Sequence, residues 1–190
     1  MSEDGILRIG LTGKMRSGKS TIADYLYLHH EFHWPLSFGS ELKRYAHEIF
    51  PDVPKDPKPR ELYQFMNVMR DFDPDVWIKH LAKRVQFAED SRKTTGIVVT
   101  DARQQNEIDW LRAHGFVIVR VVAPEQDRLK RIEESGESVT STTLAHVTEQ
   151  DLESLDVDYR IVNDGTLDEL ETKVDELVAR LKEDGEWRKD

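Results

Sequence analysis

Short runs of branched apolar residues alternate along this chain with longer segments in which apolar residues recur every three or four positions. The short runs predict strands at residues 6–11, 34–38, 97–101, 116–122 and 159–162. The longer segments predict helices that start near residues 19, 39, 59, 74, 107, 127 and 166. Because strands and helices alternate, the pattern indicates an α/β fold with a mostly parallel sheet and right-handed crossovers. Ligands are then expected beyond the carboxyl ends of the strands.

The composition narrows the class of protein. The chain has 190 residues and a net charge of −10, so it lacks the basic field of a nucleic-acid coating protein. It has no cysteine and no apolar run close to the ~20 residues of a membrane span, and its acidic start does not look like a signal peptide. We therefore expect one cytoplasmic domain that binds neither a nucleic-acid polymer nor a membrane.

One motif lies between the first expected strand and the first expected helix. The segment Gly13-Lys14-Met15-Arg16-Ser17-Gly18-Lys19-Ser20 fits the pattern G-x-x-x-x-G-K-[ST] in full. Its backbone amides would surround a β-phosphate, Lys19 would reach the β- and γ-phosphates, and Ser20 would bind Mg²⁺. Thr21 is a candidate for the α-phosphate. The alternative, a glycine-rich turn with an exposed lysine, does not explain why the motif sits between a strand and a helix.

An acid and an arginine follow the third expected strand. Asp101 could hold the Mg²⁺ shell or accept a proton from the acceptor, and Arg103 could clamp a phosphate. The alternative is that Asp101 caps the helix beginning near Gln104 and that Arg103 is a surface residue.

Two further arginines stand beside a stretch rich in Ser, Thr and Gly. Arg128 and Arg131 are three positions apart in a charged helix, and a mobile segment from about 125 to 148 could bring them to the transferred phosphoryl group as a lid. The alternative is a solvated helix whose arginines pair with Glu133 and Glu134. The segment from about 37 to 90 carries Lys43, Arg44, Arg60 and Arg70, any of which could bind the acceptor; the alternative is that each is a solvated surface residue.

Several segments together resemble the deoxynucleoside monophosphate kinases of bacteriophages. They are residues 13–24, the Asp73-Pro74-Asp75 turn with Trp77-Ile78, residues 100–109 (Thr-Asp-Ala-Arg-Gln-Gln-Asn-Glu-Ile-Asp), the strand 117–122 with Ala123-Pro124, residues 146–149, and residues 161–170 (Ile-Val-Asn-Asp-Gly-Thr-Leu-Asp-Glu-Leu). The likeness is patchy at residues 51–60 and 133–143. Ser20 departs from the Asp that is frequent in phage members, but serine is the commoner Mg²⁺ ligand.

The resemblance implies a three-layer P-loop fold, like that of nucleoside monophosphate kinases, with a five-stranded parallel sheet between helices. It also implies ATP·Mg²⁺ as donor, a deoxynucleoside 5′-monophosphate as acceptor and a role in deoxynucleotide metabolism. The residues that it places around the acceptor are Ser37, Phe38, Gly39, Lys43, Arg70 and Arg103, and those near the donor adenine are Asn163, Asp164 and Gly165.

Two other readings share parts of these motifs. One is a P-loop kinase of another phosphorylated metabolite, of the phosphomevalonate or dephospho-CoA type, and the other is a nucleotide-binding switch. The sequence leaves the accepted base, the preference between deoxyribose and ribose, and the choice between a monomer and a homodimer open.

Overall fold

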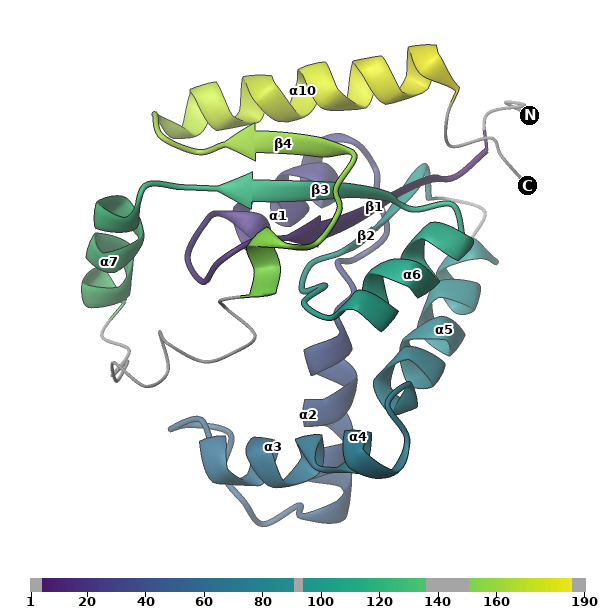
Figure 1. Ribbon diagram of the computed structural model, residues 1–190, viewed down its shortest axis with the longest axis vertical. Helices are drawn as coiled ribbons and strands as arrows, with labels where there is room; N and C mark the ends of the chain where they lie inside the picture. The colour runs from purple at the N-terminus through teal and green to yellow at the C-terminus, as the bar shows by residue number, and fades with distance from the viewer. Residues whose placement is uncertain (1–4, 91–93, 136–150, 186–190) are drawn as a thin grey trace.

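The computed structural model describes residues 5–90, 94–135 and 151–185, and Figure 1 shows their arrangement. Within this part of the chain, four parallel strands form one sheet in the order β2-β1-β3-β4. The strands are β1 (Leu7–Thr12), β2 (Gly96–Val99), β3 (Val117–Val122) and β4 (Tyr159–Val162). The carboxyl ends of all four strands therefore meet at one edge of the sheet.

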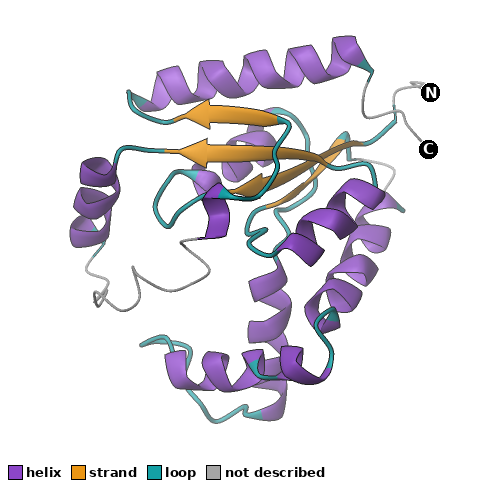
Figure 2. Cartoon of the chain, in the orientation of Figure 1, coloured by secondary structure: helices purple, strands orange, loops and turns teal. Residues whose placement is uncertain are grey.

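Helices cover both faces of the sheet (Figure 2). On one face lie α1 (Lys19–His29) and α10 (Leu167–Asp184), and on the other lie α2 (Phe38–Ile49), α5 (Val76–Glu89) and α6 (Gln105–Ala113). The side chains of β2 divide between the two resulting cores, since Ile97 and Val99 belong to the core with α5 and α6 and Val98 belongs to the core with α1 and α10. Burial on both faces explains why the strands are continuous apolar runs.

The prediction of five strands is wrong. Residues 34–38 form no strand, and this region touches β2 only through isolated bridges at Phe32 and Leu36. The Leu36 amide donates to the Val98 carbonyl and the Leu36 carbonyl accepts from the Thr100 amide. The pairing does not extend further, because the Gly96 carbonyl accepts from His33 and the Phe38 amide donates to Asp101 at the start of α2. The three-layer α/β architecture is confirmed; its sheet has four strands.

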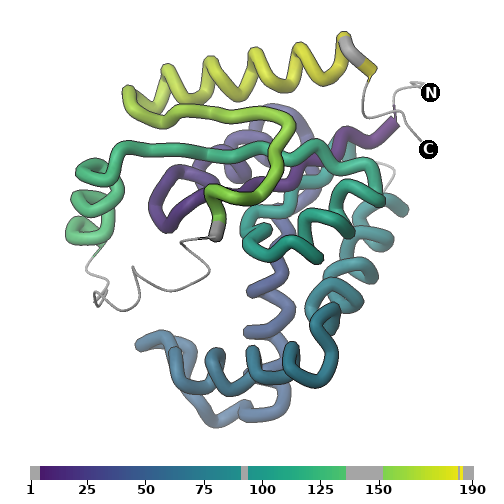
Figure 3. Tube along the Cα trace, in the orientation of Figure 1, coloured from purple at the N-terminus to yellow at the C-terminus, as the bar shows by residue number. Residues whose placement is uncertain are grey.

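Three helices lie outside the two layers. The tips of α2 and α5 carry α3 (Arg60–Asn67) and α4 (Met69–Phe72), and α7 (Glu125–Glu134) follows the carboxyl end of β3 (Figure 3). A short 3₁₀ helix, η1 (Asp151–Glu153), precedes β4. Residues 136–148 of the expected lid lie outside the described residues. No helix in the described ranges is both long enough and apolar enough to cross a bilayer.

Candidate active site

The loop from Gly13 to Ser20 joins β1 to α1 and has a strained backbone. Gly13 and Gly18 have φ angles of 136° and 108°, and Arg16 has a φ angle of 61°. A Cβ atom on Gly13 would lie 2.2 Å from the Val121 carbonyl oxygen, so only glycine fits there. The loop thus wraps into the amino end of α1, where backbone N–H groups lack helical partners.

Lys19, the first residue of α1, lies across this loop. Its Nζ donates to the carbonyl oxygens of Gly13 at 2.7 Å and Lys14 at 2.8 Å. The ammonium group is therefore held over the concave side of the loop, where a positive charge and the helix dipole act on the same point.

A buried amide ties the loop after β4 to the phosphate loop. Asn163 is 6% exposed, and its Nδ2 donates to the Ser17 carbonyl oxygen at 2.9 Å. A Cβ on Gly18 would lie 2.3 Å from that same nitrogen, so the two segments are in close contact. The adjacent Asp164 instead pairs with Lys173 at 3.2 Å, and this partner lowers the pKa of the Asp164 carboxyl group.

A cavity of about 840 Å³ opens beside the loop and collects most of the residues expected at the site. Those in its lining are Arg16, Gly18, Lys19, Ser20, Thr21, Ser37, Lys43, Asp101, Arg103, Arg131, Asn163 and Gly165. Those outside the lining are Gly13, Ser17, Phe38, Gly39, Arg70, Arg128 and Asp164. We call this cavity the main cleft.

Asp101 connects the sheet to the start of α2. Its two carboxylate oxygens accept hydrogen bonds from the backbone amides of Phe38 at 2.8 Å and Gly39 at 2.9 Å. The alternative in which Asp101 caps the helix near Gln104 is therefore wrong, because that helix is capped by Glu107, which accepts from the Gln104 amide at 3.1 Å. Asp101 satisfies two orphan amides of α2 while its carboxylate remains in the lining of the main cleft.

Glu107 is a residue of this site that the sequence did not single out. It is 2% exposed, and it accepts hydrogen bonds from the Arg103 amide at 2.8 Å and from the Arg70 guanidinium at 2.7 Å. Burial raises the pKa of Glu107, and the Arg103 amide and the Arg70 charge oppose that rise. Arg70 also donates to Gln104 Oε1 at 2.7 Å. These contacts fix the turn that carries Arg103. The sequence assigned no role to Glu107, although it lies within residues 100–109, which carry the resemblance.

The two arginines of α7 reach back to the phosphate loop. Arg128 Nη1 donates to the Met15 carbonyl oxygen at 3.3 Å, and Arg131 Nη1 donates to the Arg16 carbonyl oxygen at 3.1 Å. A helix that was only solvated would not make these two contacts with the phosphate loop. The structure therefore places α7 against the loop, with Arg131 in the lining of the main cleft.

Comparison with known proteins decides the family. A family model described as deoxynucleotide monophosphate kinase matches residues 60–174, which is more than half of the chain. The chain belongs to this family. The matched region contains Asp101, Arg103, Glu107 and both arginines of α7, and it begins after the phosphate loop. The loop is therefore an additional observation that the family match does not include.

Two curated members of the deoxynucleotide monophosphate kinase family are similar over part of their length. The chain is 35% identical to the enzyme of Escherichia phage RB69 over 81 residues, which are 43% of this chain and 28% of that protein. It is 31% identical to the enzyme of Enterobacteria phage T4 over 115 residues, which are 60% of this chain and 41% of that protein. The matches thus span less than half of these relatives.

Solved structures support the fold of this family member. A gluconokinase from Sinorhizobium meliloti superposes with a TM-score of 0.61 at 18% identity and full coverage of both chains. A sugar kinase from Janibacter sp. gives a TM-score of 0.61 at 18% identity, covering 92% of this chain and 95% of its own. At such identities the likeness shows a shared P-loop kinase-like fold and does not extend to substrates.

Proposed function

We propose that this chain transfers the γ-phosphoryl group of ATP to a deoxynucleoside 5′-monophosphate, which yields the diphosphate. The observation that carries the proposal is that Lys19 at the start of α1 and the pair Asp101 and Arg103 after β2 line one cleft. Membership of the deoxynucleotide monophosphate kinase family supports the choice of acceptor.

The donor's phosphates would lie on the phosphate loop. Its amides and the amino end of α1 supply neutral donors, and Lys19 supplies the charge. We assign Thr21 to the α-phosphate and the turn from Asn163 to Gly165 to the neighbourhood of the adenine. The bond from Asn163 to the Ser17 carbonyl supports this assignment, because it keeps that turn against the loop.

The residues of the main cleft fit a magnesium ion. Ser20 offers a hydroxyl and Asp101 a carboxylate, and both are the hard oxygen ligands that Mg²⁺ prefers. We assign these two residues to the metal. When bound, the ion would neutralise charge on the β- and γ-phosphates. Asp101 can also accept the acceptor's proton, because both of its oxygens receive only one hydrogen bond each from α2.

The acceptor would enter beside α2. Ser37, Lys43 and Arg103 line the main cleft on this side and are assigned to its phosphate end. Arg70 does not line the cleft and is engaged with Glu107 and Gln104, so we assign it to holding the turn that carries Arg103. Phe38 and Gly39 contribute through their amides, which position Asp101.

The charge that gathers on the transferred group needs cations close by. Arg131 lines the main cleft and is the nearest candidate on α7, with Arg128 one turn before it. Both are already in contact with the phosphate loop, so a small movement of α7 would bring their guanidinium groups to the γ-phosphate.

A coupled ADP-release assay with a panel of acceptors tests the proposal. We expect turnover with one or more deoxynucleoside monophosphates, and we expect Lys19→Ala to abolish it while Lys130→Ala, an exposed lysine of α7, does not. Turnover only with phosphomevalonate or dephospho-CoA would contradict the acceptor. Slow hydrolysis that no acceptor stimulates would contradict the transfer reaction itself.

A further inference from the structure

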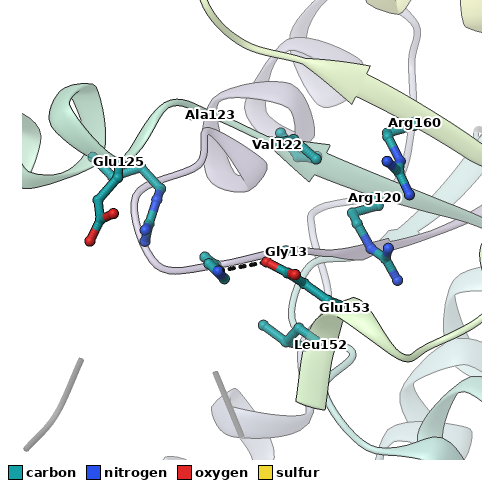
Figure 4. A pocket seen from close by; sticks show the side chains of 11 residues that line it. Gly13, Arg120, Val122, Ala123, Glu125, Leu152, Glu153 and Arg160 are labelled. Carbon is teal, nitrogen blue, oxygen red and sulfur yellow. Dashed lines mark ion pairs between the residues drawn. The ribbon is translucent and has the colours of Figure 1, made fainter. Parts of the chain in front are cut away.

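A second cavity, of about 390 Å³, lies on another side of the phosphate loop (Figure 4). It is bounded by the start of that loop, the carboxyl end of β3, the first turn of α7, η1 and β4. Its lining consists of Gly13, Lys14, Arg120, Val121, Val122, Ala123, Glu125, Arg128, Leu152, Glu153 and Arg160. None of these residues lines the main cleft, although Gly13 and Lys14 belong to the phosphate loop, so the two cavities lie on different sides of that loop.

The lining of the second cavity is predominantly positive. Four of its side chains are cationic and two are acidic. Lys14 Nζ and Glu153 form an ion pair at 2.7 Å, and Lys14, Arg120 and Arg160 all lower the pKa of the Glu153 carboxyl group. The Glu153 carboxylate is thus shared among several cations, and the lining of the second cavity keeps a net positive charge.

Arg120 is the unusual member of this group, because an arginine here interrupts the apolar run of β3. It is only 7% exposed, and its Nη2 donates to the Leu155 carbonyl oxygen. Its Nε is buried and has no hydrogen-bond partner among the described residues. A buried guanidinium is costly unless its donors and its charge are matched.

The neighbouring strands increase this cost. The register places Arg160 of β4 beside Arg120 and Thr12 of β1 on its other side. Figure 4 shows the Arg120 and Arg160 side chains extending from adjacent strands in the same direction. Arg160 is exposed and its charge acts on both Glu153 and Arg120, while the buried Thr12 Oγ1 has no hydrogen-bond partner among the described residues. Burial lowers the pKa of Arg120 and the charge of Arg160 lowers it further, whereas the carboxylates of Glu153 and Asp156 oppose this fall.

These observations describe more cations than carboxylates, with one buried guanidinium N–H left without a partner among the described residues, beside a cavity large enough for an anion. We propose that the second cavity binds a phosphate group, either as free phosphate or as a phosphate ester, between Arg120, Arg160 and Lys14. Guanidinium groups bind phosphate oxygens with charge-assisted hydrogen bonds, and the volume is in the range of sites for small ligands. Leu152 and Ala123 add apolar wall that an ester could contact.

Calorimetric titration tests this site without using the enzyme's activity. The titrations use the Lys19→Ala chain, in which the phosphate loop is disabled, with inorganic phosphate and with ribose 5-phosphate as probes. We expect saturable binding, and we expect Arg160→Gln to weaken it about five- to tenfold. Lys182→Gln, which changes the net charge equally on the exposed side of α10, should leave it unchanged.

Arg120→Gln should weaken binding more than Arg160→Gln does. Because Arg120 is buried, Arg120→Lys serves as a second variant that keeps the charge, and a melting curve checks each fold. Similar affinity for both probes indicates free phosphate as the ligand, and tighter binding of the ester indicates a phosphorylated metabolite. The absence of saturation at about 10 mM of either probe, or unchanged binding in Arg160→Gln, would overturn the proposal. Either result is independent of whether the chain transfers a phosphoryl group.

Discussion

Asp101→Asn separates two roles that the structure gives to one carboxylate. In the native chain each oxygen of Asp101 accepts one backbone amide of α2, from Phe38 at 2.8 Å and from Gly39 at 2.9 Å. The asparagine side chain has one oxygen and one NH₂ group, so one of the two amides would face another donor. The substitution also removes a negative charge from the amino end of a helix.

The loss of folding stability in Asp101→Asn can be worked out from these contacts. An unpaired donor costs about 1–3 kcal/mol, and loss of the charge–dipole interaction adds about 0.3–1 kcal/mol. We therefore expect a loss of about 2–3 kcal/mol in the free energy of unfolding. For a domain of this size that corresponds to a fall in Tm of about 5–10 °C.

The fall in kcat is expected to be much larger than this loss of folding stability can explain. If Asp101 positions the metal or accepts the proton, kcat should fall about a hundredfold or more at a temperature where the variant is fully folded. Thermal melting and coupled ADP release on the same samples measure the two effects. Val85→Ala is the matched control, because Val85 is buried in the core that α2 and α5 share and its truncation costs about 2 kcal/mol without touching the main cleft.

The comparison of Asp101→Asn with Val85→Ala also defines the result that would refute a catalytic role for Asp101. If Asp101→Asn and Val85→Ala lose similar stability and keep similar turnover, Asp101 only anchors α2. The assignment of its carboxylate to the chemistry would then be wrong.

Three further predictions follow from other contacts. Lys19→Ala should lower kcat by at least about a thousandfold, to the background of the assay, with an unchanged melting curve; near-native turnover would contradict its role. Glu107→Gln should lower the free energy of unfolding by about 1–3 kcal/mol, because the partly buried Arg70 charge loses its carboxylate partner, and an unchanged denaturation midpoint would contradict this. Burial lowers the pKa of His80 below its ordinary 6.5. As the pH drops, the unfolded chain therefore takes up the proton first, and the free energy of unfolding falls between pH 6.5 and the pKa of the folded state. His80→Asn, which keeps an acceptor for the Tyr45 hydroxyl, should show a shallower fall by denaturant titration over that range, whereas parallel curves would refute it.

The parts of the fold that the sequence predicted are those encoded by local patterns. The phosphate loop is contiguous, and its glycines occupy the backbone conformations that the motif requires. The helix at the carboxyl end begins with the expected capping box, in which the Glu169 amide donates to Thr166 Oγ1. The strand expected at residues 34–38 did not form because its ladder to β2 is limited to Leu36, with His33 bonding Gly96 before it and Phe38 already bonding Asp101 in α2 after it.

The roles at the site that were missed depend on contacts between distant segments. Asp101 meets the amides of residues 38 and 39, and Arg70 meets Glu107, across more than thirty positions in each case. The periodicity of apolar residues along the sequence does not indicate which distant residues will form such pairs. Arg120 could have been noticed as a lone charge within a strand of branched apolar residues, but its unpaired Nε and its neighbour Arg160 appear only once the strand register is known.

Transfer of label from γ-³²P-ATP in a single turnover tests the central claim most directly. With enzyme in excess and a deoxynucleoside monophosphate that supports ADP release, we predict that the label appears in the deoxynucleoside diphosphate and that Lys19→Ala prevents this. Label that appears only as inorganic phosphate, at the same rate with and without the monophosphate, would contradict the claim.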